Sequence, residues 1–116
     1  MLKTHVIVDF YMADAEILAR TDKLKAAIDR ALDSLDHEVV QESYIQFEPI
    51  GVTATVVGKM FHFSIHTWPE HGSCAIDIYS LEDKNLLRSI ASALRDSFSA
   101  QEYDIKILDR DKPAKI

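Results

Sequence analysis

The segment Met60 to Trp68 restricts the possible folds of this chain more than any other, because the character of its side chains alternates. Its apolar residues are Phe61, Phe63 and Ile65, and its polar or aromatic residues are His62, Ser64, His66 and Trp68. Successive side chains of a β-strand point to opposite sides, so the segment predicts a strand with one apolar face. The other face is too polar for a dry core and too aromatic for free water, which predicts a binding site or a subunit interface.

Period-two patterns or β-branched and aromatic composition predict five further strands. They are His5 to Phe10, Val39 to Phe47, Val52 to Val57, Cys74 to Ser80 and Tyr103 to Leu108. Apolar residues at helical spacing predict one helix that begins at Thr21, its expected cap, and another around Leu86 to Phe98. We expect Gly58-Lys59 to form a two-residue hairpin loop, because glycine suits its first central position.

The order of these elements is β-α-β-β-β-α-β, which predicts an α+β fold. Two helices would cover one face of a mainly antiparallel sheet, as a two-layer sandwich. The chain has 116 residues, enough for one domain with a real core. We expect a single domain over residues 1–110 and a flexible tail over 111–116.

Composition narrows the range of partners and compartments. Thirteen basic and nineteen acidic side chains give a net charge of -6, which argues against nucleic acid and anionic membrane surfaces as partners. Cys74 is the only cysteine, which excludes an intrachain disulfide and favours a reducing compartment. No apolar run approaches the roughly 20 residues of a membrane span. We therefore expect a cytoplasmic protein.

The histidines and Ser64 invite two catalytic interpretations. His62 and His66 are four residues apart on one strand, roughly 13 Å, so they cannot share a zinc ion, and we expect no metal. A triad of Ser64, His66 and Asp77 is disfavoured because Ser64 and His66 are about 7 Å apart on the strand, which is long for proton transfer.

Three residues near the turns have a ligand-binding interpretation and a simpler one. Phe47 and Trp68 offer surfaces for stacking on a planar ligand, although aromatic residues at strand ends more often serve packing. Glu70 is suited to bind hydroxyl groups or simply to face solvent. Residue types alone leave both interpretations open.

The run Ser64 to Glu70, with the sequence SIHTWPE, resembles the signature of bacterial and archaeal S-adenosylmethionine decarboxylases. The likeness continues to Asp77, and His5 to Tyr11, Phe47 to Thr53 and the late helix and strand agree in order and spacing. The resemblance therefore covers nearly the whole chain. It implies the fold of that family and a homodimer whose uncovered sheet faces pack together in four α-β-β-α layers.

The resemblance also implies a cofactor that this chain is not equipped to make. In the family, the proenzyme cleaves itself at a Glu-Ser bond, and the serine becomes a pyruvoyl group that acts as the electron sink for decarboxylation. The corresponding pair here is Met60-Phe61. Phenylalanine has no hydroxyl for the reaction, so we expect no cofactor to form at Phe61.

The other functional positions of the family are carried over one by one. Leu81 takes the place of the proton-donating cysteine, Thr53 that of a serine that assists processing, and the processing histidine is present as His66. The ligand-facing residues match the family: Phe47 for adenine stacking, the signature Trp68, and Glu70 near the sugar hydroxyls. The resemblance thus implies a retained pocket without its electrophile.

Three functions follow from this pattern. The first is a pseudoenzyme of the spermidine pathway that binds S-adenosylmethionine or a related nucleoside or amine and regulates an active paralogue. The second is an active adenosylmethionine decarboxylase with an unconventional processing residue such as Ser64. The third is a purely structural interaction domain. We favour the first, because Ser64 belongs to the ordinary family signature.

Overall fold

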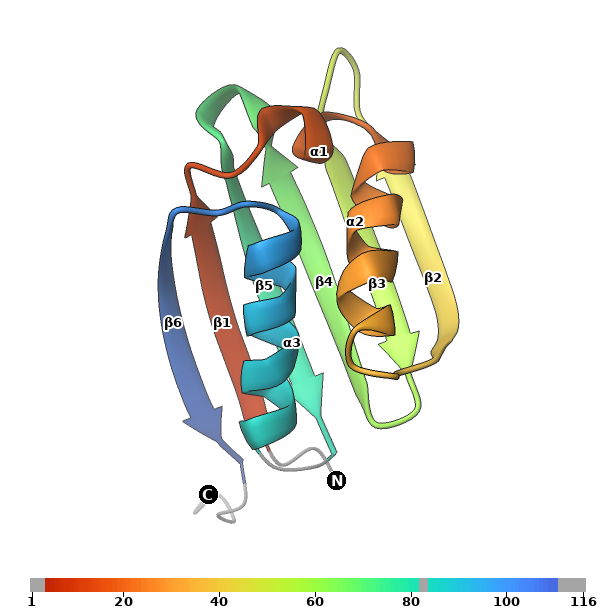
Figure 1. Ribbon diagram of the computed structural model, residues 1–116, viewed down its shortest axis with the longest axis vertical. Helices are drawn as coiled ribbons and strands as arrows, with labels where there is room; N and C mark the ends of the chain where they lie inside the picture. The colour runs from red at the N-terminus through yellow and green to blue at the C-terminus, as the bar shows by residue number, and fades with distance from the viewer. Residues whose placement is uncertain (1–3, 82–83, 111–116) are drawn as a thin grey trace, which may run out of the picture.

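The structure, a computed structural model, describes residues 4–81 and 84–110 (Figure 1). Its strands are β1 Thr4–Tyr11, β2 Val39–Gln46, β3 Val52–Gly58, β4 Phe61–Trp68, β5 Ser73–Ser80 and β6 Glu102–Asp109. Its helices are α1 Ala15–Ala19, α2 Thr21–Asp33 and α3 Lys84–Ser97, with a short 3-10 helix, η1, at Pro69–His71. The flexible tail expected at 111–116 lies outside the described residues.

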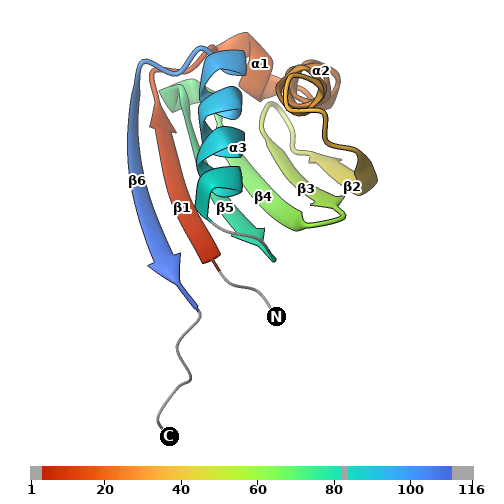
Figure 2. The ribbon, with the colours of Figure 1, turned by 60° about the horizontal axis from the view of Figure 1, so that its bottom comes forward.

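The six strands form one sheet in the order β2-β3-β4-β5-β1-β6, and every neighbouring pair is antiparallel. The helices all lie on the same side of this sheet (Figures 1 and 2). The α+β two-layer fold is therefore confirmed. The sequence patterns missed only the short elements α1 and η1.

The core lies between the sheet and the helices, on the side that the alternation of β4 predicts. Phe61, Phe63 and Ile65 are 4%, 1% and 0% exposed. From the helix layer, the buried partners are Leu24, Ala27, Ile28, Ala31 and Leu32 of α2, and Leu87, Ile90, Ala91 and Leu94 of α3. The apolar positions of both helices thus follow the expected spacing of three and four residues.

Two local expectations are wrong. Thr21 does not cap α2: its backbone N–H donates to Oε1 of Gln46 at 2.9 Å, and Arg20, the residue before the helix, makes no side-chain cap. Gly58 is not in the hairpin loop but ends β3. A Cβ atom at Gly58 would lie 2.3 Å from the Phe61 ring, so glycine is required here for close packing rather than for a turn.

The opposite face of the sheet is not covered by any described element. A row of stacked rings crosses it, with Tyr79 between His5 at 4.1 Å and His62 at 4.5 Å, measured between ring centroids. Ile45 and Trp68 also lie on this face, and they are 52% and 46% exposed. This surface is called the open face below. Its exposed apolar side chains are typical of a surface that binds a partner or a ligand.

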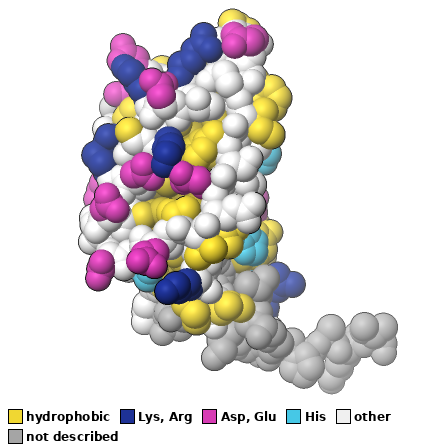
Figure 3. All heavy atoms as spheres, turned by 90° about the vertical axis from the view of Figure 1, so that its right-hand side faces the viewer, with side chains coloured by type: hydrophobic (Ala, Val, Ile, Leu, Met, Phe, Trp, Pro, Cys, Tyr) yellow, Lys and Arg dark blue, Asp and Glu magenta, His cyan; other side chains and the backbone are white. Residues whose placement is uncertain are grey.

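The side of the molecule formed by α2 and β2 is acidic, and Figure 3 shows Asp and Glu side chains spread over it. A hollow between the two elements is lined by Asp29, Asp33, Asp36, Glu38 and Glu42, with Lys25 and His37. Lys25 forms ion pairs with Asp29 and Glu42, and these hydrogen bonds raise the pKa of its ammonium group. Within residues 4–81 and 84–110, no helix is long and apolar enough to cross a membrane.

Candidate functional site

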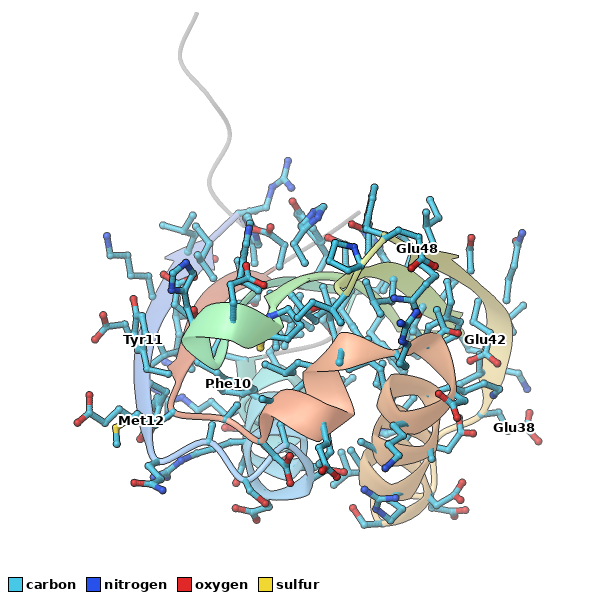
Figure 4. All side chains as sticks on the ribbon, turned by 90° about the horizontal axis from the view of Figure 1, so that it is seen from above. Phe10, Tyr11, Met12, Glu38, Glu42 and Glu48 are labelled. Carbon is cyan, nitrogen blue, oxygen red and sulfur yellow. The ribbon has the colours of Figure 1, made fainter. Side chains whose placement is uncertain are left out.

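Five of the residues singled out in the sequence meet in one hollow of about 220 Å³ at an end of the sheet. The hollow is lined by Phe47, Ile50, Gly51, Val52, Thr53, His66, Thr67, Trp68 and Glu70. Figure 4 looks onto this end of the molecule, with Glu48 of the β2–β3 loop on one side and Tyr11 and Met12 on the other. The segments that supply the hollow are this loop, the start of β3, the end of β4 and η1.

The walls of the hollow combine exposed rings with a polar pair. Phe47 is 51% exposed and Trp68 is 46% exposed, so both rings present surface to a ligand or a partner. The His66 ring lies 6.5 Å from the Trp68 ring, with an angle of 35° between them. Nδ1 of His66 and Oγ1 of Thr53 are 3.1 Å apart and share a hydrogen bond, which fixes the imidazole orientation.

The loop that carries Phe47 is held by Gln46, a residue that the sequence analysis missed. The Gln46 amide group donates to the carbonyl oxygens of Ala19 at 2.9 Å and of Phe47 and Gly51 at 3.0 Å. Its Oε1 accepts from the Thr21 N–H, and the Gly51 N–H donates to Ala19. The available signal was a polar residue on the helix-facing side of β2.

Thr67 provides a second anchor, and it too was missed. Its hydroxyl donates to the Leu18 carbonyl and accepts from the Val52 N–H, both at 2.8 Å, and the residue is only 7% exposed. A buried hydroxyl with two partners at good geometry is costly to remove. The unpredicted helix α1 therefore serves as the support for the hollow, through the carbonyls of Leu18 and Ala19.

Phe61 and Leu81 lie at the other end of β4. Phe61 pairs with Ser80 in the sheet, and the Leu81 N–H donates to the Met60 carbonyl at 2.9 Å. Phe61 and His66 are five positions apart on β4, about 17 Å along the strand, and their side chains point to opposite faces. Within one chain, Phe61 and Leu81 are therefore not part of the hollow.

The Phe61 ring packs into the core. It stacks on Phe63 at 6.0 Å with an angle of 8° and meets His37 edge-on at 5.5 Å. With Gly58 against its rim, the ring fills the end of the core. This position offers no hydroxyl and no nucleophile.

The alternative catalytic groupings do not form among the described residues. Asp77 pairs with His5, 3.0 Å from Oδ1 to Nε2, whereas His66 turns toward Thr53, so Ser64, His66 and Asp77 make no triad. Burial raises the pKa of the Cys74 thiol to about 12, so it is an inert core residue. No three ligand-type side chains are grouped for a metal in the part of the chain that the structure describes.

Fold and hollow together define a two-layer α+β domain with a small aromatic site at a sheet end. Residues 4–111 match the family model described as S-adenosylmethionine decarboxylase, and the chain belongs to this family. The S-adenosylmethionine decarboxylase proenzyme of Archaeoglobus fulgidus is 30% identical over 106 residues, which cover 91% of this chain and 95% of that protein. The proenzyme of a Sulfurihydrogenibium species is 34% identical over 115 residues, with coverages of 99% and 77%.

A solved structure agrees with these relatives. The crystal structure of the adenosylmethionine decarboxylase from Aquifex aeolicus superimposes with a TM-score of 0.85 and 26% identity, over 99% of this chain and 95% of that one. The family resemblance seen in the sequence is confirmed. This chain is a homologue of the pyruvoyl-dependent enzymes of polyamine biosynthesis.

Proposed function

We propose that this chain is a decarboxylase homologue that no longer carries out the reaction and instead binds S-adenosylmethionine or a related nucleoside or amine. The observation that carries the proposal is the Phe61 ring, buried in the core where the family resemblance aligns the cofactor-forming serine. A pyruvoyl group arises from a hydroxyl that attacks the preceding carbonyl, and Phe61 has none. The cofactor therefore does not fit the residues present.

Leu81 adds to this argument. The resemblance aligns it with the cysteine that donates a proton, and a leucine side chain has no proton to transfer. Restoring activity thus requires more than one substitution. Ser64 lies on the open face, paired with Asp77 of β5, and it belongs to the ordinary family signature.

Retained binding is supported by the exposed rings of the hollow. A half-exposed Phe47 ring suits stacking on a purine base, because an aromatic side chain stacks favourably on the flat face of any base. The Glu70 carboxylate, at the same hollow, accepts hydrogen bonds from sugar hydroxyls. Packing within one chain covers only about half of the Phe47 and Trp68 side chains, which leaves ring surface for a ligand.

A second copy completes the site in this proposal. The hollow of about 220 Å³ is smaller than the roughly 300–1,000 Å³ of typical ligand pockets. Packing two open faces about a two-fold axis across the strands creates four α-β-β-α layers and buries Ile45 and Trp68. It also sets the Phe61 end of one copy over the Trp68 end of the other. An active paralogue with the same face is equally able to take the second place.

Binding is tested by calorimetry with S-adenosylmethionine, its decarboxylated form and methylthioadenosine. We expect saturable binding of at least one of them below millimolar concentration. If all three fail to bind, the exposed rings serve packing, and a structural interaction domain replaces this proposal.

Loss of the reaction is tested separately, by intact mass spectrometry of the purified chain. We expect one full-length polypeptide, because no ester forms at Phe61. Two fragments, with a carbonyl at a new N-terminus, would mean an active enzyme with an unconventional processing residue. Light scattering checks assembly, for which we expect a dimer at micromolar concentration; a strict monomer contradicts the four-layer arrangement.

A further inference from the structure

The helix layer is narrower than the sheet that it covers. Six strands at about 4.8 Å spacing are roughly 24 Å wide, whereas two long helices about 10 Å apart cover roughly 20 Å. In Figures 1 and 2, α2 lies over the β2–β4 half of the sheet and α3 over β5 and β1, while none of the helices in residues 4–81 and 84–110 lies over β6. The helix-facing side chains of β6 are therefore left open along one side of α3.

A groove of about 380 Å³ runs along this uncovered strip, within the range typical of small-molecule sites. It is lined by Val8, Phe10, Arg88, Ala91, Ser92, Arg95, Tyr103, Ile105 and Ile107. Phe10 and Ala91 form part of its apolar floor, at 1% and 6% exposure. On its outer wall, Tyr103 and Ile105 are 45% and 37% exposed, so apolar surface faces water here.

Two arginines of α3 stand at this groove. Arg88 and Arg95 are seven residues apart, which places them on one side of the helix with about 10 Å between their turns. The Arg95 guanidinium lies over the Tyr103 ring at 4.5 Å, and its Nε donates to the Ala100 carbonyl at 3.3 Å. This contact orients the group and leaves its two terminal nitrogens for an anion.

Neither guanidinium forms an ion pair with a carboxylate among the described residues. This is unusual in a chain of net charge -6, in which the hollow between α2 and β2 is lined by five acidic residues. Among the lining residues that the structure describes, none is acidic. Its combination of positive charge and apolar floor is complementary to an anion with an apolar body.

We propose that the groove between α3 and β6 binds an elongated apolar monocarboxylate. The carboxylate accepts two hydrogen bonds from the terminal nitrogens of Arg95, a geometry that the planar guanidinium favours. The apolar body lies over Phe10 and Ala91 and extends toward Arg88. The positive charge of Arg88 attracts the carboxylate without a direct hydrogen bond. The site is on the helix side of the sheet, so it is independent of the open face and of the nucleoside hollow.

The test uses octanoate as the probe, with octan-1-ol and octylammonium as matched controls that keep the chain and change only the head group. Amide chemical shifts of the isotopically labelled full-length protein are followed during titration. We expect saturable shifts confined to α3, β1 and β6 at millimolar concentration or below, and weaker binding of both controls. Equal binding of octan-1-ol, or no saturation with octanoate, overturns the proposal and leaves a macromolecular partner as the occupant to consider.

Variants locate the head group. Arg95→Gln should weaken octanoate binding about tenfold or more, as expected for loss of hydrogen bonds to a charged group. Arg88→Gln should have a smaller effect, and Arg30→Gln on the exposed surface of α2 should have none. Arg95→Lys keeps the positive charge but loses the paired terminal nitrogens of the guanidinium. It tests the same two hydrogen bonds if the glutamine variant folds poorly. Unchanged affinity in either folded Arg95 variant overturns the assignment.

Discussion

The two ends of β4 have opposite surroundings. At its first residue, Phe61 is 4% exposed and sealed by Gly58, Phe63 and His37. At its last residue, Trp68 is 46% exposed and borders the hollow that also holds Phe47. One strand thus has a closed end inside the core and an open end that faces water.

The proposed function assigns the lost reaction to the closed end and the retained binding to the open end. The closed end has a large ring where the family resemblance implies a small reactive side chain, and the neighbouring Gly58 makes room for it. At the open end, Phe47 and Trp68 leave about half of their surface exposed. Substitutions at the two ends should therefore affect different measurements.

The largest effect is expected at the closed end. Phe61→Ala removes a buried ring and leaves a cavity, which should lower the free energy of unfolding by about 3–5 kcal/mol. Urea unfolding measures this, with Leu81→Ala as the control, because Leu81 is at the same end but 40% exposed. Equal, small losses in both variants would show that the end is not closed.

Gly58→Ala tests why that end is tight. An added methyl meets the Phe61 ring and should cost about 1–3 kcal/mol of unfolding free energy through overpacking. In a Phe61→Ala background the same change should cost much less, because the ring is gone. A double-mutant cycle from urea unfolding quantifies the coupling, and additive effects would contradict the proposed contact.

At the open end, Phe47→Ala should weaken binding of the nucleoside identified by calorimetry about 5- to 150-fold through lost stacking. Its free energy of unfolding should change by no more than about 0.5 kcal/mol, as for other exposed positions. Met12→Ala, which removes a 54% exposed side chain at the same end but outside the hollow, is the control. A stability loss without a binding loss would make Phe47 a packing residue.

The smallest effect is expected for Glu70→Gln. The amide keeps one acceptor oxygen but loses the charge that strengthens its hydrogen bonds, so affinity should fall about 2- to 5-fold. Glu48→Gln is the matched control, because Glu48 pairs with Arg20 on the neighbouring loop and does not line the hollow. If the two variants bind the nucleoside equally well, Glu70 faces solvent and does not contribute to binding.

Much of the fold could be predicted from the sequence. The alternation of β4 identified its buried face, and the helical spacing from Leu24 identified the buried side of α2. These signals are strong because they repeat over eight or more residues of one element. Helix α1 has only five residues, too few for a period to emerge, and it was missed.

The residues of the candidate site could be predicted from the sequence, but the hydrogen bonds that hold them in place could not. The family resemblance pointed to Phe47, His66, Trp68 and Glu70, and these residues line one hollow. It could not reveal that Gln46 and Thr67 hold that hollow to α1, because their partners are backbone carbonyls distant in sequence. Backbone acceptors have no sequence signature, so such anchors emerge only when the chain is folded.

Periodicity and side-chain chemistry are local properties, so the sequence alone indicates which face of β4 is buried and that residue 61 has no hydroxyl. The space that Gly58 leaves for Phe61 and the groove that the helices leave over β6 appear only in the folded molecule. Those features depend on strand register, helix width and contacts between distant segments. They are set by how the elements pack, which no single segment specifies.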